Sequence, residues 1–333
     1  ILITLNNQRY LMRKKAFQLI RFLSLNYFFQ RTRKNQLLIL MFHQVNDSNR
    51  TFYPAMPISV FKKICEYINS YYEVIHVSEI QNHFINSSRP AAIITFDDGH
   101  FDILENAFPI LSNLNMKFTI NIDTEIIQTR KPQDLVRVWD ILNQVEIDNY
   151  FNPSFMSKPI KIDRDNPMNT EREFTKTLAN LDLLQRRKFV DEMETLTKTG
   201  EIKFSTMLSA EDIKFLHKNS GEVASHSHTH SILTNLATDE VDFELSESKR
   251  ILEEITCEEV NTLAYPNGVF SEEVMERGKK LGYKFFLKTE DKINRINRED
   301  LETSFFRVNQ YHKSASEALA FIYGITNFIR KII

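Results

Sequence analysis

The sequence has few of the residues that mark special structural classes. Of its 333 residues, seven are glycine and only two, Cys65 and Cys257, are cysteine. Two isolated cysteines exclude a disulfide framework and a C-x-x-C metal site, so cysteine does not carry the chemistry. No stretch approaches the ~18 consecutive apolar residues that cross a bilayer, and we predict no transmembrane segment.

An excess of charge of one sign is also lacking. Lys and Arg number 42 against 44 Asp and Glu, which gives a formal net charge of −2 and a pI near 6.6. Nucleic-acid binding normally leaves a basic footprint, so we expect no nucleic-acid partner. With 42% hydrophobic and 26% charged residues the chain is globular, and long enough for one large domain with an insertion or for two domains.

Both ends of the chain carry basic, apolar segments. Residues 13–34 have a basic start and an apolar centre interrupted by Arg21, a poor match to a signal peptide. Such a segment either packs on the domain as a helix or attaches peripherally to an anionic membrane, and residues 318–333 allow the same two interpretations. We therefore expect a cytoplasmic or membrane-peripheral protein, or an extracytoplasmic one if a signal lies upstream of Ile1. The sequence does not indicate an oligomeric state.

Short apolar runs alternate with helix-period segments in two parts of the chain. This alternation predicts βαβ units and a parallel sheet, hence an α/β fold. The pattern breaks at about residues 133–205, which are charged and helix-prone and which we interpret as a helical insertion. It resumes after Gly221. The predicted organisation is an amphipathic helix region at 1–36, one domain at 37–315 and a C-terminal helix at 316–333.

Two adjacent aspartates, Asp97 and Asp98, follow the apolar run at residues 91–96. In parallel α/β folds, catalytic groups gather where strands end. Capping of the next helix is the alternative, but one aspartate suffices for a cap. Neighbouring carboxylates repel each other, so a pair makes sense if a cation neutralises one and the other takes a proton. The pair therefore predicts a cation site with a base beside it.

Three histidines, His226, His228 and His230, follow a second strand-like run. Histidine is the commonest transition-metal ligand. His226 and His230 can bind one ion from the same side of a helical turn, whereas His226 and His228 would do so from an extended segment. Two histidines and one carboxylate leave open positions on zinc or a similar divalent ion, which is typical of a catalytic site.

These motifs resemble those of a known family. "TFDDG" at residues 95–99, followed by "HSHTH" at 226–230, resembles the polysaccharide deacetylase family, also called the NodB-homology domain or carbohydrate esterase family 4. "LMFHQVND" at 40–47 and "AYPNG" at 264–268 resemble motifs of its exopolysaccharide-deacetylase branch. The resemblance covers about residues 37–310. It implies a distorted (β/α) barrel of seven to eight strands, with an active-site groove at the carboxyl ends of the strands.

The resemblance also implies residue roles. Asp98, His226 and His230 would hold the divalent metal, zinc foremost, and Asp97 would be the general base. A divalent ion lowers the pKa of water to ~7 in favourable sites, which supplies a nucleophile at neutral pH. The implied reaction is hydrolytic removal of N-acetyl groups from amino sugars of a polysaccharide or glycan precursor. The expected partner is therefore an N-acetylated glycan.

Two histidines are candidates for the general acid. Many family members use a C-terminal histidine, for which this sequence offers only His312. In the exopolysaccharide branch the residue is moved to the N-terminal strand, where His43 lies at the end of an apolar run. We favour His43 over His312, because the surroundings of His312 match the C-terminal motif poorly.

Three further expectations concern the groove. The family's third motif usually brings an arginine that orients the catalytic aspartate, but residues 262–268 contain none, and Arg307 could substitute. Tyr265 and Pro266 are expected to shape the groove wall. His100 stands where the family usually has a tyrosine, and it either lines the groove or faces solvent.

Two other functions fit part of the sequence. A catalytically weak glycan-binding protein would keep the fold and the groove. A membrane-peripheral scaffold for polysaccharide assembly would use the terminal helices. A binding module does not need a free base beside a metal ligand, so the intact aspartates and histidines favour the enzyme.

Overall fold

The computed structural model describes residues 33–145, 149–195, 202–297, 299, 303–310 and 314–322. Most of the amphipathic region predicted at 1–36 lies outside the described residues, and the helix predicted at 316–333 is described only as α13 (Ala315–Ile322). Among the described helices, none has both the length and the apolarity that a membrane span requires. Membrane attachment and the domain boundaries therefore stay predictions.

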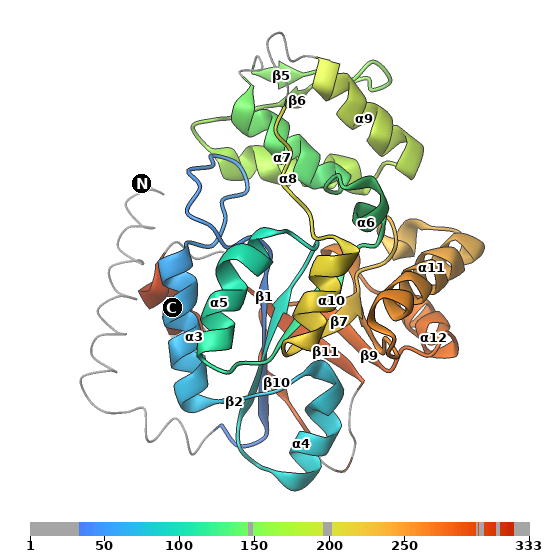
Figure 1. The fold of residues 1–333 in the computed structure, drawn as a ribbon. Helices are drawn as coiled ribbons and strands as arrows, with labels where there is room; N and C mark the ends of the chain where they lie inside the picture. The colour runs from blue at the N-terminus through green and yellow to red at the C-terminus, as the bar shows by residue number, and fades with distance from the viewer. Residues whose placement is uncertain are drawn as a thin grey trace, which may run out of the picture.

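Within the described chain, seven parallel strands close into a barrel (Figure 1). Neighbouring strands follow the order β1, β11, β9, β8, β7, β4 and β3, and β3 pairs back to β1. The predicted distorted (β/α) barrel is confirmed. Its strands are β1 (Gln36–Phe42), β3 (Ala91–Phe96), β4 (Phe118–Ile122), β7 (Gly221–Ser225), β8 (Thr262–Ala264), β9 (Phe285–Thr289) and β11 (Ser304–Asn309).

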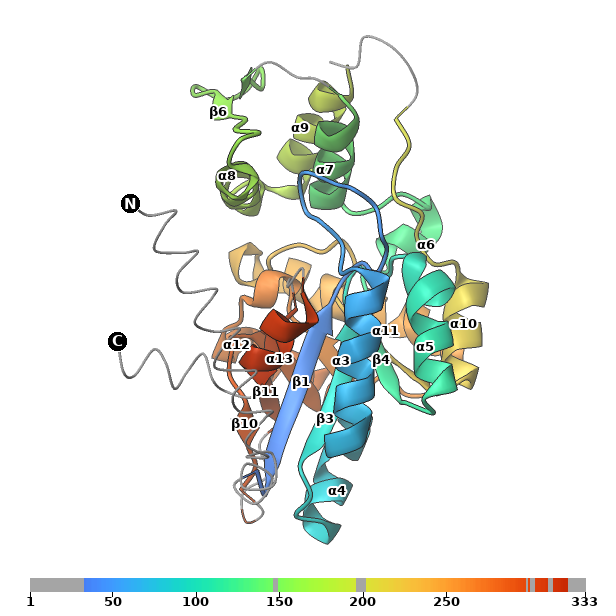
Figure 2. The same cartoon turned by 90° about the vertical axis from the view of Figure 1, so that its left-hand side faces the viewer.

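Helices surround the barrel (Figure 2). Two short strands extend its amino-terminal end. β2 (Glu73–Val74) runs parallel to the start of β3, and β10 (Asn294–Arg295) runs antiparallel to the start of β1. The surrounding α-helices, besides α13, are α3 (Ile58–Tyr71), α4 (Ile80–Asn86), α5 (Phe108–Asn113), α6 (Glu125–Thr129), α10 (Ala210–Lys218), α11 (Thr238–Thr256) and α12 (Glu272–Lys280). Short 3-10 turns occur at Val77–Glu79, Leu233–Asn235 and Pro266–Gly268, and a π turn at Ile103–Ala107.

Strand alternation decides which side chains face the inside of the barrel. In β1, Leu38 and Leu40 pack outward with the helices, whereas Leu37 and Ile39 belong to the inner core. Because side chains alternate along a strand, the inner series continues to His43, just past the strand end. The corresponding series in β3, β7 and β11 also lead to polar residues. The period of the strands thus places polar groups at the carboxyl end of the barrel.

A helical insertion lies over the carboxyl ends of the strands (green, at the top of Figure 1). Its hydrophobic core is separate from that of the barrel and includes Trp139, Phe174 and Phe189. The ring of Phe174 lies 6.0 Å from each of the other two rings. Phe52, from the loop after β1, joins this core. The elements of the insertion are α7 (Asp134–Gln144), β5 (Tyr150–Phe151), β6 (Ile160–Lys161), α8 (Pro167–Ala179) and α9 (Leu183–Thr195).

Candidate active site

Polar side chains gather in one cavity between the barrel and the insertion. His43, Asp97 and His226 each directly follow a barrel strand, and Arg307 lies within β11. Together with Asp98 they line a cavity of about 650 Å³. Residues of α8 form the opposite wall. The parallel strands therefore bring together polar groups that are far apart in the sequence.

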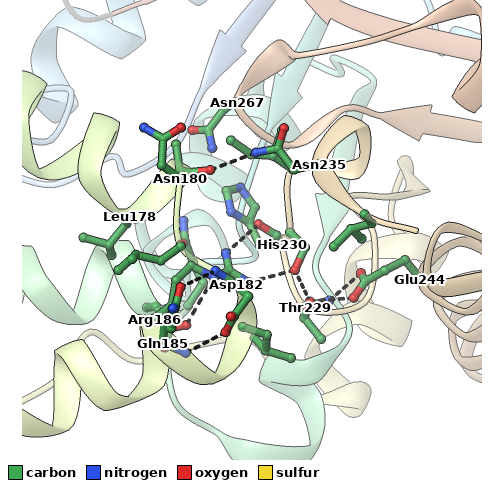
Figure 3. Close-up of a pocket in the computed structure, with 18 of the residues that line it drawn as sticks. Leu178, Asn180, Asp182, Gln185, Arg186, Thr229, His230, Asn235, Glu244 and Asn267 are labelled. Carbon is green, nitrogen blue, oxygen red and sulfur yellow. Dashed lines mark hydrogen bonds and ion pairs between the residues drawn. The ribbon is translucent and has the colours of Figure 1, made fainter. Parts of the chain in front are cut away.

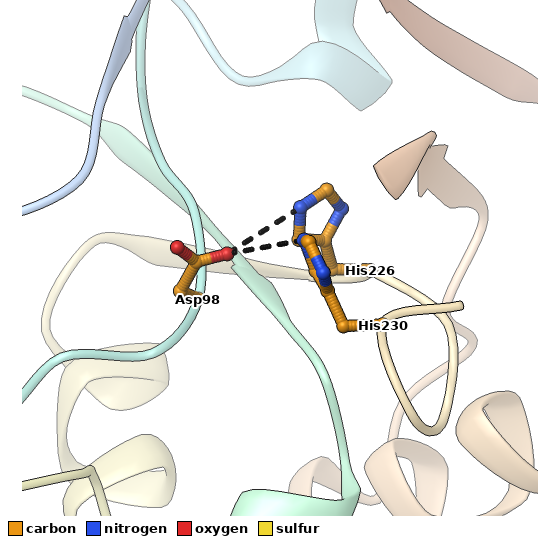
Figure 4. A group of neighbouring side chains, drawn as sticks. All are labelled: Asp98, His226 and His230. Carbon is orange, nitrogen blue, oxygen red and sulfur yellow. Dashed lines mark ion pairs between the residues drawn. The ribbon is translucent and has the colours of Figure 1, made fainter. Parts of the chain in front are cut away.

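Three atoms of the kind that bind metals converge in Figure 4. Oδ1 of Asp98 lies 3.6 Å from Nε2 of His226 and 3.5 Å from Nε2 of His230. The three candidate ligand atoms lie within 4.8 Å of one another, and all three residues are buried. Oδ1 of Asp98 has no hydrogen-bond partner in the described part of the chain. A buried carboxylate oxygen without a donor, facing two imidazole nitrogens, fits a divalent cation.

The histidine motif contributes its first and last members to this cluster. His226 and His230 face Asp98, whereas Nδ1 of His228 lies 2.9 Å from Oγ1 of Thr124. The segment is a loop rather than the helical turn we considered, with φ of 68° at Ser227 and 55° at His230. These left-handed conformations bend the chain, which turns both rings toward the same carboxylate.

The backbone sets the orientation of His226. Its Nδ1 lies 2.7 Å from the carbonyl oxygen of Ala264. A carbonyl oxygen only accepts, so Nδ1 carries the proton and donates it, and Nε2 presents a lone pair toward Asp98. Protein metal sites commonly fix a histidine ligand in this way.

Burial opposes charge in the cluster. It raises the pKa of the Asp98 carboxyl and lowers the pKa of the His230 imidazole. Both shifts favour the uncharged form of the group. A bound cation would stabilise the ionised form of Asp98 and requires a neutral His230. The charge balance of these residues therefore also fits a divalent metal.

Asp97 has different partners from Asp98. Nη1 of Arg307 and Nδ2 of Asn121 each donate to Oδ1 of Asp97, both at 2.6 Å. Burial alone would raise the pKa of Asp97, but the nearby Arg307, His226 and His43 outweigh it and hold that pKa well below its ordinary value. Oδ2 lies 3.7 Å from Nε2 of His226. Asp97 is thus an ionised carboxylate with one oxygen fixed and the other facing the cluster.

The turn that contains Asp98 depends on Gly99, the residue that follows it. Asp98 and Gly99 both have φ of 68°, in the left-handed region. A Cβ atom at Gly99 would lie 2.6 Å from Cδ1 of Ile126, too close for a side chain. This turn directs the adjacent carboxylates to different neighbours, Asp97 toward Arg307 and Asp98 toward the histidines.

His43 lines the same cavity as both aspartates. Its ring meets the ring of Tyr53 edge-on, with centroids 5.7 Å apart. His312, the alternative general acid, lies outside the described residues. The preference for His43 therefore stays a prediction.

Comparisons with known proteins agree with this arrangement. Residues 174–286 match the family model described as polysaccharide deacetylase, a range that includes His226 and His230. This part of the chain matches a polysaccharide deacetylase domain. The predicted family and enzyme class, a deacetylase of the hydrolase type, are thereby confirmed. No curated protein matches the chain in sequence.

Several solved structures share the fold of this deacetylase domain. The deacetylase PplD of Streptococcus pyogenes, in complex with acetate, is 15% identical over 86% of this chain and 97% of its own, with a TM-score of 0.58. IcaB of Ammonifex degensii is 13% identical over 87% and 98%, with a TM-score of 0.56. A polysaccharide deacetylase of Bacillus cereus, BC0361, is 19% identical over 86% and 69%, with a TM-score of 0.52. At these identities the likeness concerns the fold.

The groove wall of the deacetylase domain differs from our expectation. The side chain of Tyr265 is fully buried, and its ring lies 6.2 Å from the ring of Phe286 instead of lining the cavity. Pro266 is buried as well, and the next two residues, Asn267 and Gly268, line the cavity instead. Tyr265 belongs to the hydrophobic core between the strands and the outer helices, so its ring lies outside the cavity.

His100 occupies neither of its two predicted positions, because it does not line the cavity either. It is buried, so it does not face solvent, and Nδ1 accepts a hydrogen bond of 3.2 Å from Nε2 of Gln44. Burial, with His43 and Arg50 nearby, lowers its pKa to about 3. Its Nε2 lies 3.9 Å from Oδ2 of Asp98. The neutral ring of His100 therefore lies next to Asp98, a candidate metal ligand.

Sequence reasoning missed two residues that support the site. Asn121 donates to Asp97, and its signal was available, since it is polar within the apolar strand β4. Arg186 lies on α9 of the insertion and is buried. It donates to the carbonyl oxygen of His230 at 3.3 Å and to Oγ of Ser231 at 2.7 Å. No sequence pattern distinguishes Arg186 from the adjacent Arg187, so only the tertiary structure identifies it.

Proposed function

We propose that this chain is a metal-dependent deacetylase that removes N-acetyl groups from amino sugars of a polysaccharide or glycan precursor. The observation that carries the proposal is Oδ1 of Asp98, buried without a donor and facing Nε2 of His226 and of His230. The deacetylase family match supports the reaction class. The partner would be an N-acetylated glycan, met in the cytoplasm or at a membrane periphery.

Asp98, His226 and His230 would hold a divalent metal ion, zinc foremost. When bound, such an ion supplies Lewis-acid chemistry, lowering the pKa of water and polarising a carbonyl oxygen. Two histidines and one carboxylate leave coordination positions open for these tasks. The backbone carbonyl of Ala264 holds His226 in the tautomer that this role needs.

Asp97 would act as the general base. Its Oδ1 is occupied by Arg307 and Asn121, so Oδ2 is the oxygen that can accept a proton from the attacking water. Arg307 also keeps Asp97 ionised, and an ionised carboxylate is the form that a base requires. The pairing thus reserves one oxygen for orientation and the other for proton transfer.

His43 would act as the general acid. A new bond forms between the water oxygen and the acetyl carbon, and the bond between that carbon and the sugar nitrogen breaks. The leaving nitrogen needs a proton, which a protonated His43 can donate from its place on the wall of the same cavity. The products are acetate and a free amino sugar.

The decisive experiment combines metal analysis with acetate release. Purified protein is assayed on N-acetylglucosamine oligomers as isolated, after chelation, and after zinc is restored. We expect acetate release that chelation abolishes and zinc restores. Release that is insensitive to chelation would reject metal dependence. Metal-loaded protein that binds these oligomers without releasing acetate would favour the glycan-binding alternative.

A further inference from the structure

One buried acidic side chain binds the loop that carries the candidate metal-ligating histidines, residues 226–231, which we call the histidine loop. Glu244 lies on α11 and is only 5% exposed. Its Oε2 accepts hydrogen bonds from the backbone N–H groups of His228 at 2.8 Å and Thr229 at 2.9 Å. Its Oε1 accepts a third from Oγ1 of Thr229 at 2.5 Å. Within the described chain, every hydrogen bond of this carboxylate goes to the histidine loop.

A chain of hydrogen bonds continues from Glu244 through the histidine loop to Arg186 of the insertion. Nη2 of Arg186 donates to Oγ of Ser231 at 2.7 Å, and the hydroxyl oxygens of Ser231 and Thr229 are 2.7 Å apart. An ionised carboxylate only accepts, so the Thr229 hydroxyl donates to Glu244 and accepts from Ser231. All three bonds then point from the guanidinium to the carboxylate. Figure 3 shows Thr229 between Glu244 and Arg186.

The backbone of the histidine loop needs this support. Ser227 and His230 have φ of 68° and 55°, in the left-handed region that residues other than glycine rarely adopt. Such angles persist where surrounding contacts over-determine them. The two N–H groups that Glu244 binds lie between these positions. Glu244 therefore fastens the stretch whose curvature turns the rings of His226 and His230 toward Asp98.

No other group in the described part of the chain accepts from these two N–H groups. Without the carboxylate, the buried N–H of His228 and the half-buried N–H of Thr229 would lose their acceptor. An unpaired buried N–H is costly, so the loop would relax toward a conformation that satisfies both groups. That relaxation would move the imidazole of His230 away from Asp98.

We propose that Glu244 is a positioning residue for the metal centre, and that Glu244, Thr229, Ser231 and Arg186 form one clamp on the histidine loop. Glu244 acts through the backbone of the loop rather than as a metal ligand. This inference rests on the proposed function and adds to it the residues that set metal affinity.

The test measures zinc affinity of the purified protein by competition with a chromophoric chelator, and ligand geometry by the absorption of bound cobalt. Glu244→Ala should weaken zinc affinity about 10- to 100-fold and change the cobalt spectrum. Glu244→Gln keeps an oxygen for the two N–H groups and should restore an affinity close to that of the wild type. Glu254→Ala is the matched control, because Glu254 is exposed on the same helix and pairs with Arg250.

Two further variants test the clamp as a unit. Thr229→Val has a similar shape but no hydroxyl, so it breaks the chain between Glu244 and Arg186 and should weaken zinc affinity several-fold. When Glu244→Ala and Arg186→Met are combined, the loss should be smaller than the product of the two single losses, because either substitution opens the same clamp. A full product would overturn the joint action of the two residues.

Circular dichroism and thermal unfolding of the metal-free proteins establish that each variant is folded. A folded Glu244→Ala variant with wild-type zinc affinity and cobalt spectrum overturns this inference alone, and so does an equal loss of affinity in Glu244→Gln. If Glu244→Ala does not fold, Thr229→Val decides, and an unchanged affinity there overturns the inference. A wild type that binds no zinc would instead overturn the proposed function.

Discussion

In the barrel, cavity-facing side chains lie at the ends of strands and in the loops that follow them, whereas in the insertion they come from helices α7 and α8. The barrel contributes His43 and Asp97, which directly follow strands, and Arg307, which lies within β11. In the insertion, α8 contributes side chains at intervals of three and four residues, the spacing of a single helix face. These are Met168, Glu171, Arg172, Thr175, Lys176 and Ala179.

The two regions are also held in place differently. Asp97 and Arg307 are 210 residues apart in sequence and meet because the sheet closes on itself. The insertion has its own aromatic core, which Phe52 of the loop after β1 joins, and the 2.6 Å ion pair between Arg50 and Asp140 adds a polar contact to the same loop. The positions of the reactive groups therefore depend on strand register. The cavity wall above them depends instead on the insertion, which has its own hydrophobic core.

Among the variants considered, Asp97→Asn in the barrel is expected to lower activity the most. The amide has the same shape but cannot accept the proton, so kcat should fall about 10²- to 10⁴-fold while bound metal is retained. Steady-state acetate release and elemental analysis measure the two quantities. Near-normal turnover would show that the base lies elsewhere, and loss of metal would make Asp97 a ligand.

Phe174→Ala tests whether the insertion is a separate unit. Removing this fully buried ring should destabilise the insertion's core by about 3 to 5 kcal/mol. Trp139, the single tryptophan of the sequence, belongs to that core and reports on it by fluorescence. In urea unfolding, we expect the variant's fluorescence transition to occur at a lower urea concentration than that of the wild type. The main far-UV circular dichroism transition should stay at the wild-type urea concentration. Coincident shifts would show that the two regions unfold as one unit.

His43→Gln tests the remaining catalytic position of the barrel. Loss of the proton donor should reduce kcat about 100-fold, whereas His312→Gln should change it little. Both variants are assayed at saturating oligomer with metal content checked. The opposite order would assign the general acid to the C-terminal histidine.

Arg186→Met tests a contact through which the insertion supports the metal cluster. Arg186 donates to His230 and Ser231, so its loss should weaken zinc affinity about 10- to 100-fold. Competition with a chromophoric chelator gives the affinity, and the absorption of a bound cobalt ion reports the ligand geometry. Arg187→Met is the matched control, because Arg187 pairs with Glu125 instead. Equal losses in both variants would point to general damage to α9, and no loss would mean that the barrel alone positions His230.

Much of the barrel could be predicted from local patterns. The run at residues 91–96 and the aspartates after it identify a strand and its functional end, because burial on both faces and a polar strand end are local features. The histidine motif showed the ligand types in the same way. The predicted residues His43, Asp98, His230 and Arg307 line one cavity, and their roles remain predictions.

Other features could not be read from local patterns. The choice of His230 over His228 follows from left-handed backbone angles at Ser227 and His230, for which the residue types give no signal. Tyr265 follows a strand as the site residues do, yet its ring is packed against Phe286. Whether a side chain at a strand end enters the cavity depends on what fills the neighbouring space.

The sequence by itself determined the strand period, the positions where polar groups follow apolar strands, and the chemistry of a carboxylate and two histidines. These depend on residues within a few positions of one another. The tertiary structure decided that Arg307 and Asn121 hold Asp97, that Arg186 holds the histidine loop, and that the insertion lies over the carboxyl ends of the strands (Figure 1). Those contacts join strands and helices distant in sequence, so they exist only once the barrel has closed and the insertion has packed above it.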